Sequence, residues 1–301
     1  MMDDTGISSR YALQPTGPEM TVDLAGRADV GRERDHQEDA FDAPQPPFSP
    51  EEYERGVLLI VADGVGGARA GEEASRLAVE ITRQTFTEQW SPDTRYTLES
   101  AIAQANAAVY TRGREEEFSG MGTTIVCAVL RRGQLYVAHV GDSRLYRLRG
   151  GWLEQLTVDH SWVQEQVNRG VLTEDQARNH PKRHIVSRSL GARATVEVEL
   201  GQFNLRDGDT VLLCSDGLYE MVGNETIAEV MTRLPLPQAC ERLIAMANEA
   251  GGTDNITVVL AVAHLRGEMA PSPRFEDEEA TQRHRTVDEE QTAERRAASR
   301  L

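Results

Sequence analysis

Four aspartates of this chain share one sequence context, because each lies in or beside a turn that adjoins an apolar stretch. They are Asp63, Asp142, Asp216 and Asp254. A carboxylate at the end of a buried strand is poorly solvated and needs a partner, yet no run of Lys or Arg lies near them in the sequence. Several such carboxylates brought together would repel one another unless cations lay between them. Ligand sets made only of oxygen favour Mg²⁺ or Mn²⁺ over zinc.

Each of these aspartates also has a simpler interpretation as a turn residue. Asp-Gly, which occurs at Asp63-Gly64 and Asp216-Gly217, is a common turn dipeptide. The segment Gly141-Asp142-Ser143 predicts a tight turn between two strands, in keeping with an antiparallel hairpin. Four such sites in one chain, each tied to an apolar strand, favour a metal site, although the spacing does not show that they converge in space.

A second acidic group follows an arginine in the segment Arg34-Asp-His-Gln-Glu38-Asp39. Next to a metal cluster, Arg34 could bind an oxyanion, because the guanidinium fork matches the geometry of phosphate. The alternative is a surface arginine that pairs with Asp35 or Glu38. The segment alone does not distinguish the two.

Composition narrows the class of partner. The 301-residue chain has 49 acidic and 32 basic residues, a formal net charge of −17. This balance argues against nucleic acid as a partner, since phosphate backbones need clustered Lys and Arg. An acidic surface can concentrate divalent cations, but it equally serves solubility.

The apolar runs are too short for a membrane span. The longest are Val57–Ala62, Thr124–Leu130 and Thr257–Ala263, against roughly 20 residues for a membrane helix. No basic segment followed by an apolar core marks a signal peptide. The three cysteines lie far apart in apolar stretches and predict buried free thiols in a reducing cytoplasm. They are Cys127, Cys214 and Cys240.

Apolar periodicity predicts alternating short strands and amphipathic helices between two loose ends. The expected strands are 57–63, 123–130, 135–140, 145–148, 196–200, 210–214 and 255–263. The expected helices lie around 70–85, 98–109, 227–234 and 237–247, and a partly helical insertion covers 159–190. Within it, Gly170 is expected to end one helix, and Thr173 with Gln176 to cap the next.

These elements predict three segments along the chain. Residues 1–20 form a flexible N-terminal arm, 21–266 a single catalytic domain, and 267–301 a disordered charged tail. The strands and paired helices predict an α+β fold in which sheets are covered by helices.

Taken together, the motifs resemble those of the PPM-type, or type 2C, metal-dependent Ser/Thr protein phosphatases in their bacterial form. The resemblance runs from about Asp23 to Leu265. Its motifs are Gly31–Asp39, Ala62-Asp-Gly-Val-Gly-Gly67, Gly122-Thr-Thr124, Gly141-Asp-Ser-Arg-Leu-Tyr146, Ser215-Asp-Gly-Leu218 and Gly252-Thr-Asp-Asn-Ile-Thr257. It implies a four-layer αββα architecture, in which a sandwich of two antiparallel β-sheets is flanked by helix pairs.

The resemblance also implies a role for each site residue. Asp63 is expected to bridge two metals, with the Gly64 carbonyl as a further ligand. Asp216 and Asp254 would complete the first metal's shell, and Glu38 with Asp39 would act mainly through metal-bound waters. Two Mn²⁺ or Mg²⁺ ions would bind tightly, and Asp142 with Asp216 would hold a weaker third. Arg34 would hold the substrate phosphate, beside a mobile flap at 159–190.

Three positions depart from the family pattern. Family members often have Asn where this chain has Gln37, which is also an amide. Many bacterial relatives have His where this chain has Ala68, and animal members place a proposed general-acid His where it has Val65. A metal-bound water is then the candidate proton donor to the leaving oxygen. We interpret His36, His139 and His160 as structural.

The implied reaction is hydrolysis of phosphoserine and phosphothreonine by in-line attack of a metal-bridging water. A phosphorylated Ser/Thr kinase and its targets are the expected partners, and a cytoplasmic monomer is the expected state. Two alternatives stay open: a catalytically inactive relative that binds phosphoproteins, and a metal-dependent hydrolase of nucleotides or nucleic acid. The first would lack a metal ligand, and none is missing here.

Overall fold

The apolar run at residues 57–62 forms a strand that is buried on both faces. In the computed structural model this strand is β3 (Val57–Val65). Its even-numbered apolar residues pack with helices, whereas its odd-numbered ones, from Val57 to Val61, pack against a second sheet. Successive side chains of a strand point to opposite faces, so a strand between two apolar layers needs an apolar residue at every position. The continuous run thus predicts the layering.

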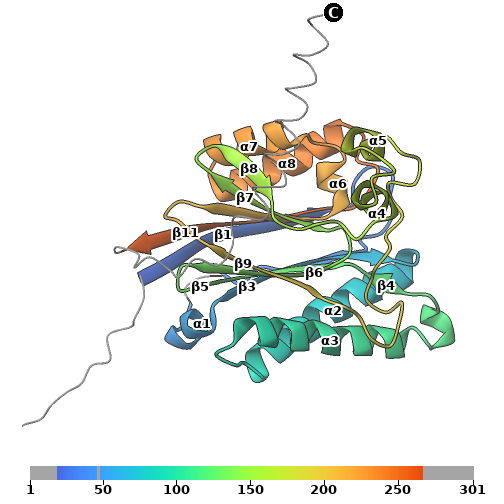
Figure 1. Ribbon diagram of the computed structural model, residues 1–301, viewed down its shortest axis with the longest axis horizontal. Helices are drawn as coiled ribbons and strands as arrows, with labels where there is room; N and C mark the ends of the chain where they lie inside the picture. Colours follow the sequence, from blue (N-terminus) through green and yellow to red (C-terminus); the bar gives the residue numbers. More distant parts are fainter. Residues whose placement is uncertain (1–18, 46–47, 267–301) are drawn as a thin grey trace, which may run out of the picture. The chain divides into compact units, whose positions relative to one another are not determined.

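The structure describes residues 19–45 and 48–266. Two antiparallel sheets lie face to face (Figure 1), with strand orders β1-β11-β10-β7-β8 and β2-β3-β5-β6-β9, and β4 pairs with β3. The remaining strands are β1 (Glu19–Asp29), β2 (Asp39–Asp42), β4 (Gly122–Thr123), β5 (Ile125–Arg131), β6 (Gln134–Val140), β7 (Arg144–Arg149), β8 (Trp152–Gln155), β9 (Glu199–Asn204), β10 (Thr210–Cys214) and β11 (Ile256–Arg266).

Helix pairs cover the outer faces of the sandwich, α2 and α3 on one side and α7 and α8 on the other (Figure 1). The helices are α1 (Pro50–Arg55), α2 (Ala68–Glu88), α3 (Thr94–Arg112), α4 (Trp162–Asn168), α5 (Glu174–Arg178), α6 (Asp216–Tyr219), α7 (Asn224–Arg233) and α8 (Leu236–Glu249), with a 3₁₀ turn η1 (Glu116–Phe118). The predicted sandwich of two antiparallel sheets between helix pairs is confirmed.

Several predicted elements have different bounds. The strand expected at 196–200 runs from Glu199 to Asn204, because Val196 and Val198 contact the helix-covered core without joining the sheet ladder. Strand β1 begins at Glu19, so the last two residues of the predicted arm belong to a sheet. The rest of that arm, and the tail predicted over 267–301, lie outside the described residues.

The turn at Gly141–Ser143 does not close a hairpin, contrary to our prediction. Strand β6 belongs to one sheet and β7 to the other, so this short segment carries the chain across the sandwich. A tight connection suits a hairpin, but it suits equally well a step between stacked sheets about 10 Å apart. Asp142 therefore stands where the chain crosses between the sheets.

The crossing depends on a glycine. Gly141 has φ +109°, a conformation that costs other residues about 1–2 kcal/mol. A Cβ at this position would also lie 2.6 Å from the Thr124 Cβ atom. Gly150 has φ +57° but no atom within 4 Å of its would-be Cβ, so it provides a matched comparison.

We expect Gly141→Ala to lower the free energy of unfolding by about 2–5 kcal/mol, because overpacking adds about 1–3 kcal/mol to the backbone strain of about 1–2 kcal/mol. Gly150→Ala should cost about 1–2 kcal/mol, since only the strain applies. Urea denaturation of the two variants measures the difference. Equal losses would show that the contact with Thr124 relaxes without cost.

Candidate active site

Two predicted site residues lie opposite each other on neighbouring strands. Asp39 of β2 pairs with Asp63 of β3 in the antiparallel ladder. The Asp39 Oδ2 atom accepts hydrogen bonds from the hydroxyls of Ser215 (2.7 Å) and Thr257 (2.6 Å). Its Oδ1 atom is buried and has no hydrogen-bond partner among the described residues. Burial, chiefly, raises the pKa of Asp39 to about 6.

Further carboxylates converge on this pair. Burial raises the pKa of Asp63 well above its ordinary value, and the negative charges of four other aspartates raise it further. These are Asp39, Asp216, Asp142 and Asp254. Residues that lie up to 215 positions apart in the chain therefore form one electrostatically coupled cluster, which the sequence motifs did not show.

Asp216 and Asp142 meet at the side of the cluster where the two sheets are joined. Asp216 is the first residue of α6, one residue after the end of β10. It therefore lies at the start of a helix and not in a simple turn. Burial and then the Asp142 charge raise the pKa of Asp216 well above its ordinary value, and its Oδ1 atom lacks a hydrogen-bond partner within the described chain. Burial and then the charge of Asp159 raise the pKa of Asp142 to about 7.

These carboxylates fit divalent cations. They are buried or half-buried and mutually repulsive, and they include unpartnered oxygen atoms on Asp39 and Asp216. Such groups are costly without a counter-charge, and hard cations such as Mg²⁺ and Mn²⁺ take oxygen ligands of this kind.

Glu38 and Arg34 form the rim of the cluster. The Glu38 carboxylate lies against the first turn of α2, where a Cβ on Gly71 would come within 2.0 Å of its Oε2 atom. Arg34 Nη2 donates to Asp254 Oδ2 at 2.7 Å, and Nη1 lies 3.8 Å from Glu38 Oε1. Arg34 thus bridges two acidic site residues and does not pair with Asp35 in the part of the chain described.

Asn255 organises the rim, a role that the sequence analysis missed. Its side chain donates to the carbonyl oxygens of Val30 (2.8 Å) and His36 (2.9 Å) and accepts from the Glu38 backbone N–H (2.7 Å). The residue is 3% exposed. Its position directly after Asp254, at the start of an apolar strand, was the available signal. For Thr257 the signal was a polar residue within the apolar start of that strand.

Two of the three histidines predicted to be structural, His139 and His160, have structural contacts, whereas His36 is exposed. His160 clamps Gly141 twice: its backbone N–H donates to the Gly141 carbonyl (2.9 Å), and its Nδ1 accepts from the Gly141 N–H (3.0 Å). The ring of His139 stacks on that of His160, with centroids 4.7 Å apart. Both rings are buried. They hold the turn that carries Asp142.

The predicted flap is anchored at both ends near the site. At its start, Asp159 receives a bidentate ion pair from Arg144, whose guanidinium lies over Tyr219 at 3.5 Å. Near its end, His184 Nδ1 lies 3.0 Å from Glu220 Oε1 on the chain just after α6. The predicted capping box of Thr173 and Gln176 at α5 is present.

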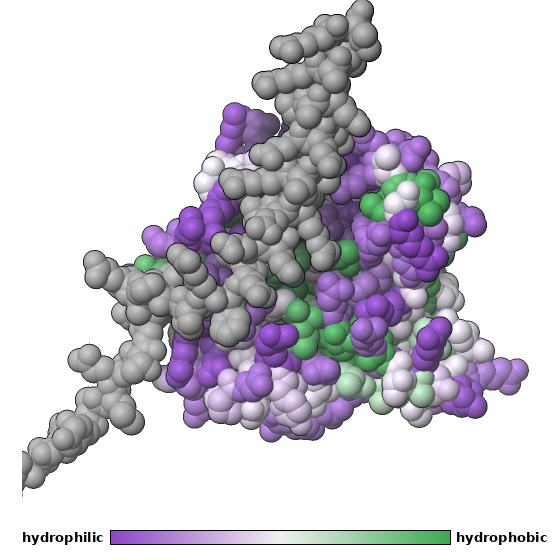
Figure 2. Space-filling view, in the orientation of Figure 1, coloured by the Kyte–Doolittle hydropathy of each residue, from purple (hydrophilic) through white to green (hydrophobic). Residues whose placement is uncertain are grey.

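Two large apolar residues of the flap are exposed. Val171 and Ile185 present 65% and 47% of their surface to solvent. On the face shown in Figure 2, hydrophilic residues predominate, and a small apolar group lies over the region of α4 and α5 in Figure 1. The flap thus offers apolar surface beside the acidic cluster.

The sequence matches known phosphatases over most of its described length. The family model described as Protein phosphatase 2C matches residues 35–261. Serine/threonine phosphatase stp of Listeria monocytogenes is 38% identical over 245 residues, which cover 79% of this chain and 95% of that protein. Serine/threonine protein phosphatase PstP of Mycobacterium tuberculosis is 37% identical over 243 residues, which cover 80% of this chain and 45% of that protein.

Solved structures show the same fold. The crystal structure of M. tuberculosis PstP has a TM-score of 0.72 at 36% identity and covers 80% of this chain and 98% of its own. A structure of the PstP catalytic domain in complex with two manganese ions has a TM-score of 0.71 at 34% identity, covering 82% of this chain and 100% of its own. The chain therefore belongs to the protein phosphatase 2C family.

Proposed function

We propose that this protein is a metal-dependent phosphatase that hydrolyses phosphoserine and phosphothreonine in proteins. The observation that carries the proposal is the cluster of buried, mutually repulsive aspartates with Arg34 at its rim. The cluster can hold cations, and the guanidinium can hold the phosphate. The relatives are named serine/threonine phosphatases, which supports the class of substrate.

The residues divide into ligands of two tightly bound cations and of a weaker third. Asp63 is proposed to bridge the first two, with the Gly64 carbonyl, Asp216 and Asp254 as further ligands. Glu38 and Asp39 act mainly through water. Asp142 and Asp216 hold the third, a pairing supported by the effect of the Asp142 charge on the Asp216 pKa. Manganese or magnesium suits this oxygen-rich set, and the related PstP catalytic domain was solved in complex with two manganese ions.

When bound, two such cations lower the pKa of a water and neutralise the phosphoryl charge. The protein's own groups then orient the ester. Arg34 donates to Asp254 in this structure, so its guanidinium binds the phosphoryl oxygens when Asp254 serves as a metal ligand. The anchored flap covers the phosphorylated side chain, and its exposed Val171 and Ile185 offer apolar contact to the substrate chain.

The substrates, the cellular location and the oligomeric state belong to the same proposal. Phosphorylated proteins, including a Ser/Thr kinase and its targets, are the proposed substrates. A cytoplasmic location is proposed, supported by three free buried cysteines in the described chain. A monomer is the proposed oligomeric state. Within that part of the chain no helix has both the length and the apolar character to cross a bilayer.

Phosphate release from a phosphothreonine peptide should require Mn²⁺ or Mg²⁺ and stop when a chelator is added. Asp63→Asn should reduce turnover to below about a tenth, because its carboxylate is proposed to contact two cations. A nucleoside monophosphate serves as the comparison substrate. Faster hydrolysis of the nucleotide than of the peptide would contradict the proposed substrate class.

Arg34→Ala should lower kcat/KM by about 10- to 100-fold, because a hydrogen bond to a charged group contributes roughly 1.5–3 kcal/mol. Metal content, measured by elemental analysis, should stay unchanged, since Arg34 is proposed to contact the substrate. The neighbouring Arg32→Ala, at an exposed residue, is the control. If Arg34→Ala lost metal as well as activity, Arg34 would have a structural role at the rim of the cluster, and its proposed contact with the substrate would be wrong.

Metal-free protein should become less stable as the pH rises from about 4 to 7. The folded-state pKa values of Asp39 and Asp142, about 6 and about 7, lie above the unfolded value near 3.9. Their stabilising contribution is present below that value and is lost as the pH rises through the folded values. Added Mn²⁺ should restore the stability at neutral pH.

The same repulsion predicts that Asp63→Asn stabilises the metal-free protein at pH 7.5. Each 1 kcal/mol of repulsion removed should raise Tm by roughly 2–4 °C. Asp254→Asn is the comparison variant and should gain less stability, because it also loses the ion pair with Arg34. Thermal melts in chelator measure both variants. A lower Tm for Asp63→Asn would show that the carboxylates are not under mutual repulsion.

A further inference from the structure

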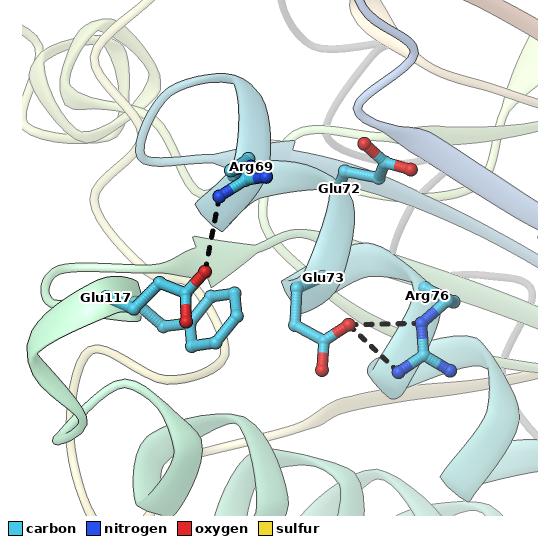
Figure 3. Close-up of a pocket in the computed structure, with 6 residues that line it drawn as sticks. Arg69, Glu72, Glu73, Arg76 and Glu117 are labelled. Atoms are coloured by element: carbon cyan, nitrogen blue, oxygen red, sulfur yellow. Dashed lines mark hydrogen bonds and ion pairs between the residues drawn. The ribbon is translucent and has the colours of Figure 1, made fainter.

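A small pocket adjoins the acidic cluster between the first turns of α2 and η1. Its volume is about 140 Å³. Figure 3 shows the six residues that line it, five of which are charged. They are Arg69, Glu72, Glu73, Arg76, Glu117 and Phe118.

The pocket lies next to the proposed active site along α2. Gly71, on the first turn of α2, packs against the Glu38 carboxylate, and Glu72 is the next residue. Burial, chiefly, raises the pKa of Glu38, and the Glu72 charge contributes to that rise. On the other side, η1 leads into β4, which pairs with Gly64 and Val65 of β3. A peptide whose phosphate reaches the cluster therefore has neighbouring residues within reach of this pocket.

The charges of the pocket leave one carboxylate without a partner. Arg69 Nη1 lies 3.3 Å from Glu117, and Arg76 Nη2 lies 2.9 Å from Glu73. Glu72 is exposed, and within the described chain its carboxylate has neither a hydrogen bond nor an ion pair. Figure 3 shows this carboxylate pointing away from the paired groups. The free negative charge therefore lies at the edge of the pocket, away from the paired groups, while the pocket's two arginines are neutralised.

We propose that this pocket binds a lysine or arginine side chain of the substrate, close in sequence to the phosphorylated residue, with Glu72 as the residue that selects it. The proposal rests on the proposed phosphatase function. An acidic side chain would have to separate Arg69 from Glu117 and would meet the Glu72 charge. A basic one pairs with Glu72 without breaking any existing ion pair.

The test compares phosphothreonine peptides that differ at one position. Arginine, alanine or aspartate is placed at each of the three positions on either side of the phosphothreonine, and kcat/KM is measured with Mn²⁺. At the best position, the wild-type protein should favour arginine over alanine by about three- to fivefold, as expected for an exposed ion pair. High salt should reduce this ratio.

Glu72→Gln should bring the ratio of arginine to alanine peptide close to one, and Glu72→Lys should make aspartate the favoured residue. The ratio within each variant cancels any general effect of the substitution on catalysis. Glu88→Gln, at an exposed residue 16 positions further along α2 and so roughly 24 Å away, should keep the wild-type ratio.

Three outcomes would overturn the proposal: no preference for arginine in the wild-type protein, a preference that survives in Glu72→Gln, or a wild-type preference for aspartate. The last would assign the pocket to an anionic side chain through Arg69. Failure of the phosphatase function itself is distinguishable, because then none of the peptides would be hydrolysed.

Discussion

Mutual repulsion among buried carboxylates is the constraint on which the rest of this structure depends. Asp39, Asp63, Asp142 and Asp216 all have pKa values raised chiefly by burial. A fold that concentrates such charges must hold them by other means until cations neutralise them. The sandwich does so with strands whose apolar cores fix the ends from which the aspartates project.

Neutral polar groups complete this support at the junction of the two sheets. Hydroxyls from β11 and from the end of β10 hold Asp39, and Asn255 ties the loop before Glu38 to the strand that follows Asp254. Because these groups carry no charge, they orient carboxylates without neutralising them. The cluster therefore keeps its affinity for cations, and Arg34 remains free to exchange Asp254 for a phosphate.

Local sequence patterns predicted much of the fold. Strand β10 occupies the predicted residues 210–214, and the capping box at Thr173 lies where its sequence placed it. The elements that were predicted wrongly or missed depend on pairing with strands that are far away in the sequence. The segment 141–143 crosses between sheets and does not form a hairpin, because loop length does not determine which strand β7 will pair with. Strand β1 was missed because its pairing with β11 spans almost the whole described chain.

For the site, the sequence by itself determined the chemistry: aspartates at strand ends and an arginine whose fork matches phosphate, in motifs of known order. Side-chain type and local backbone preference are properties of neighbouring residues, so a pattern can carry them. Only the tertiary structure decided that these aspartates share one buried cluster, that Arg34 pairs with Asp254, and that Glu72 is left without a partner among the described residues. Those facts depend on contacts between residues far apart in the chain, which form only when two sheets and their helices pack together.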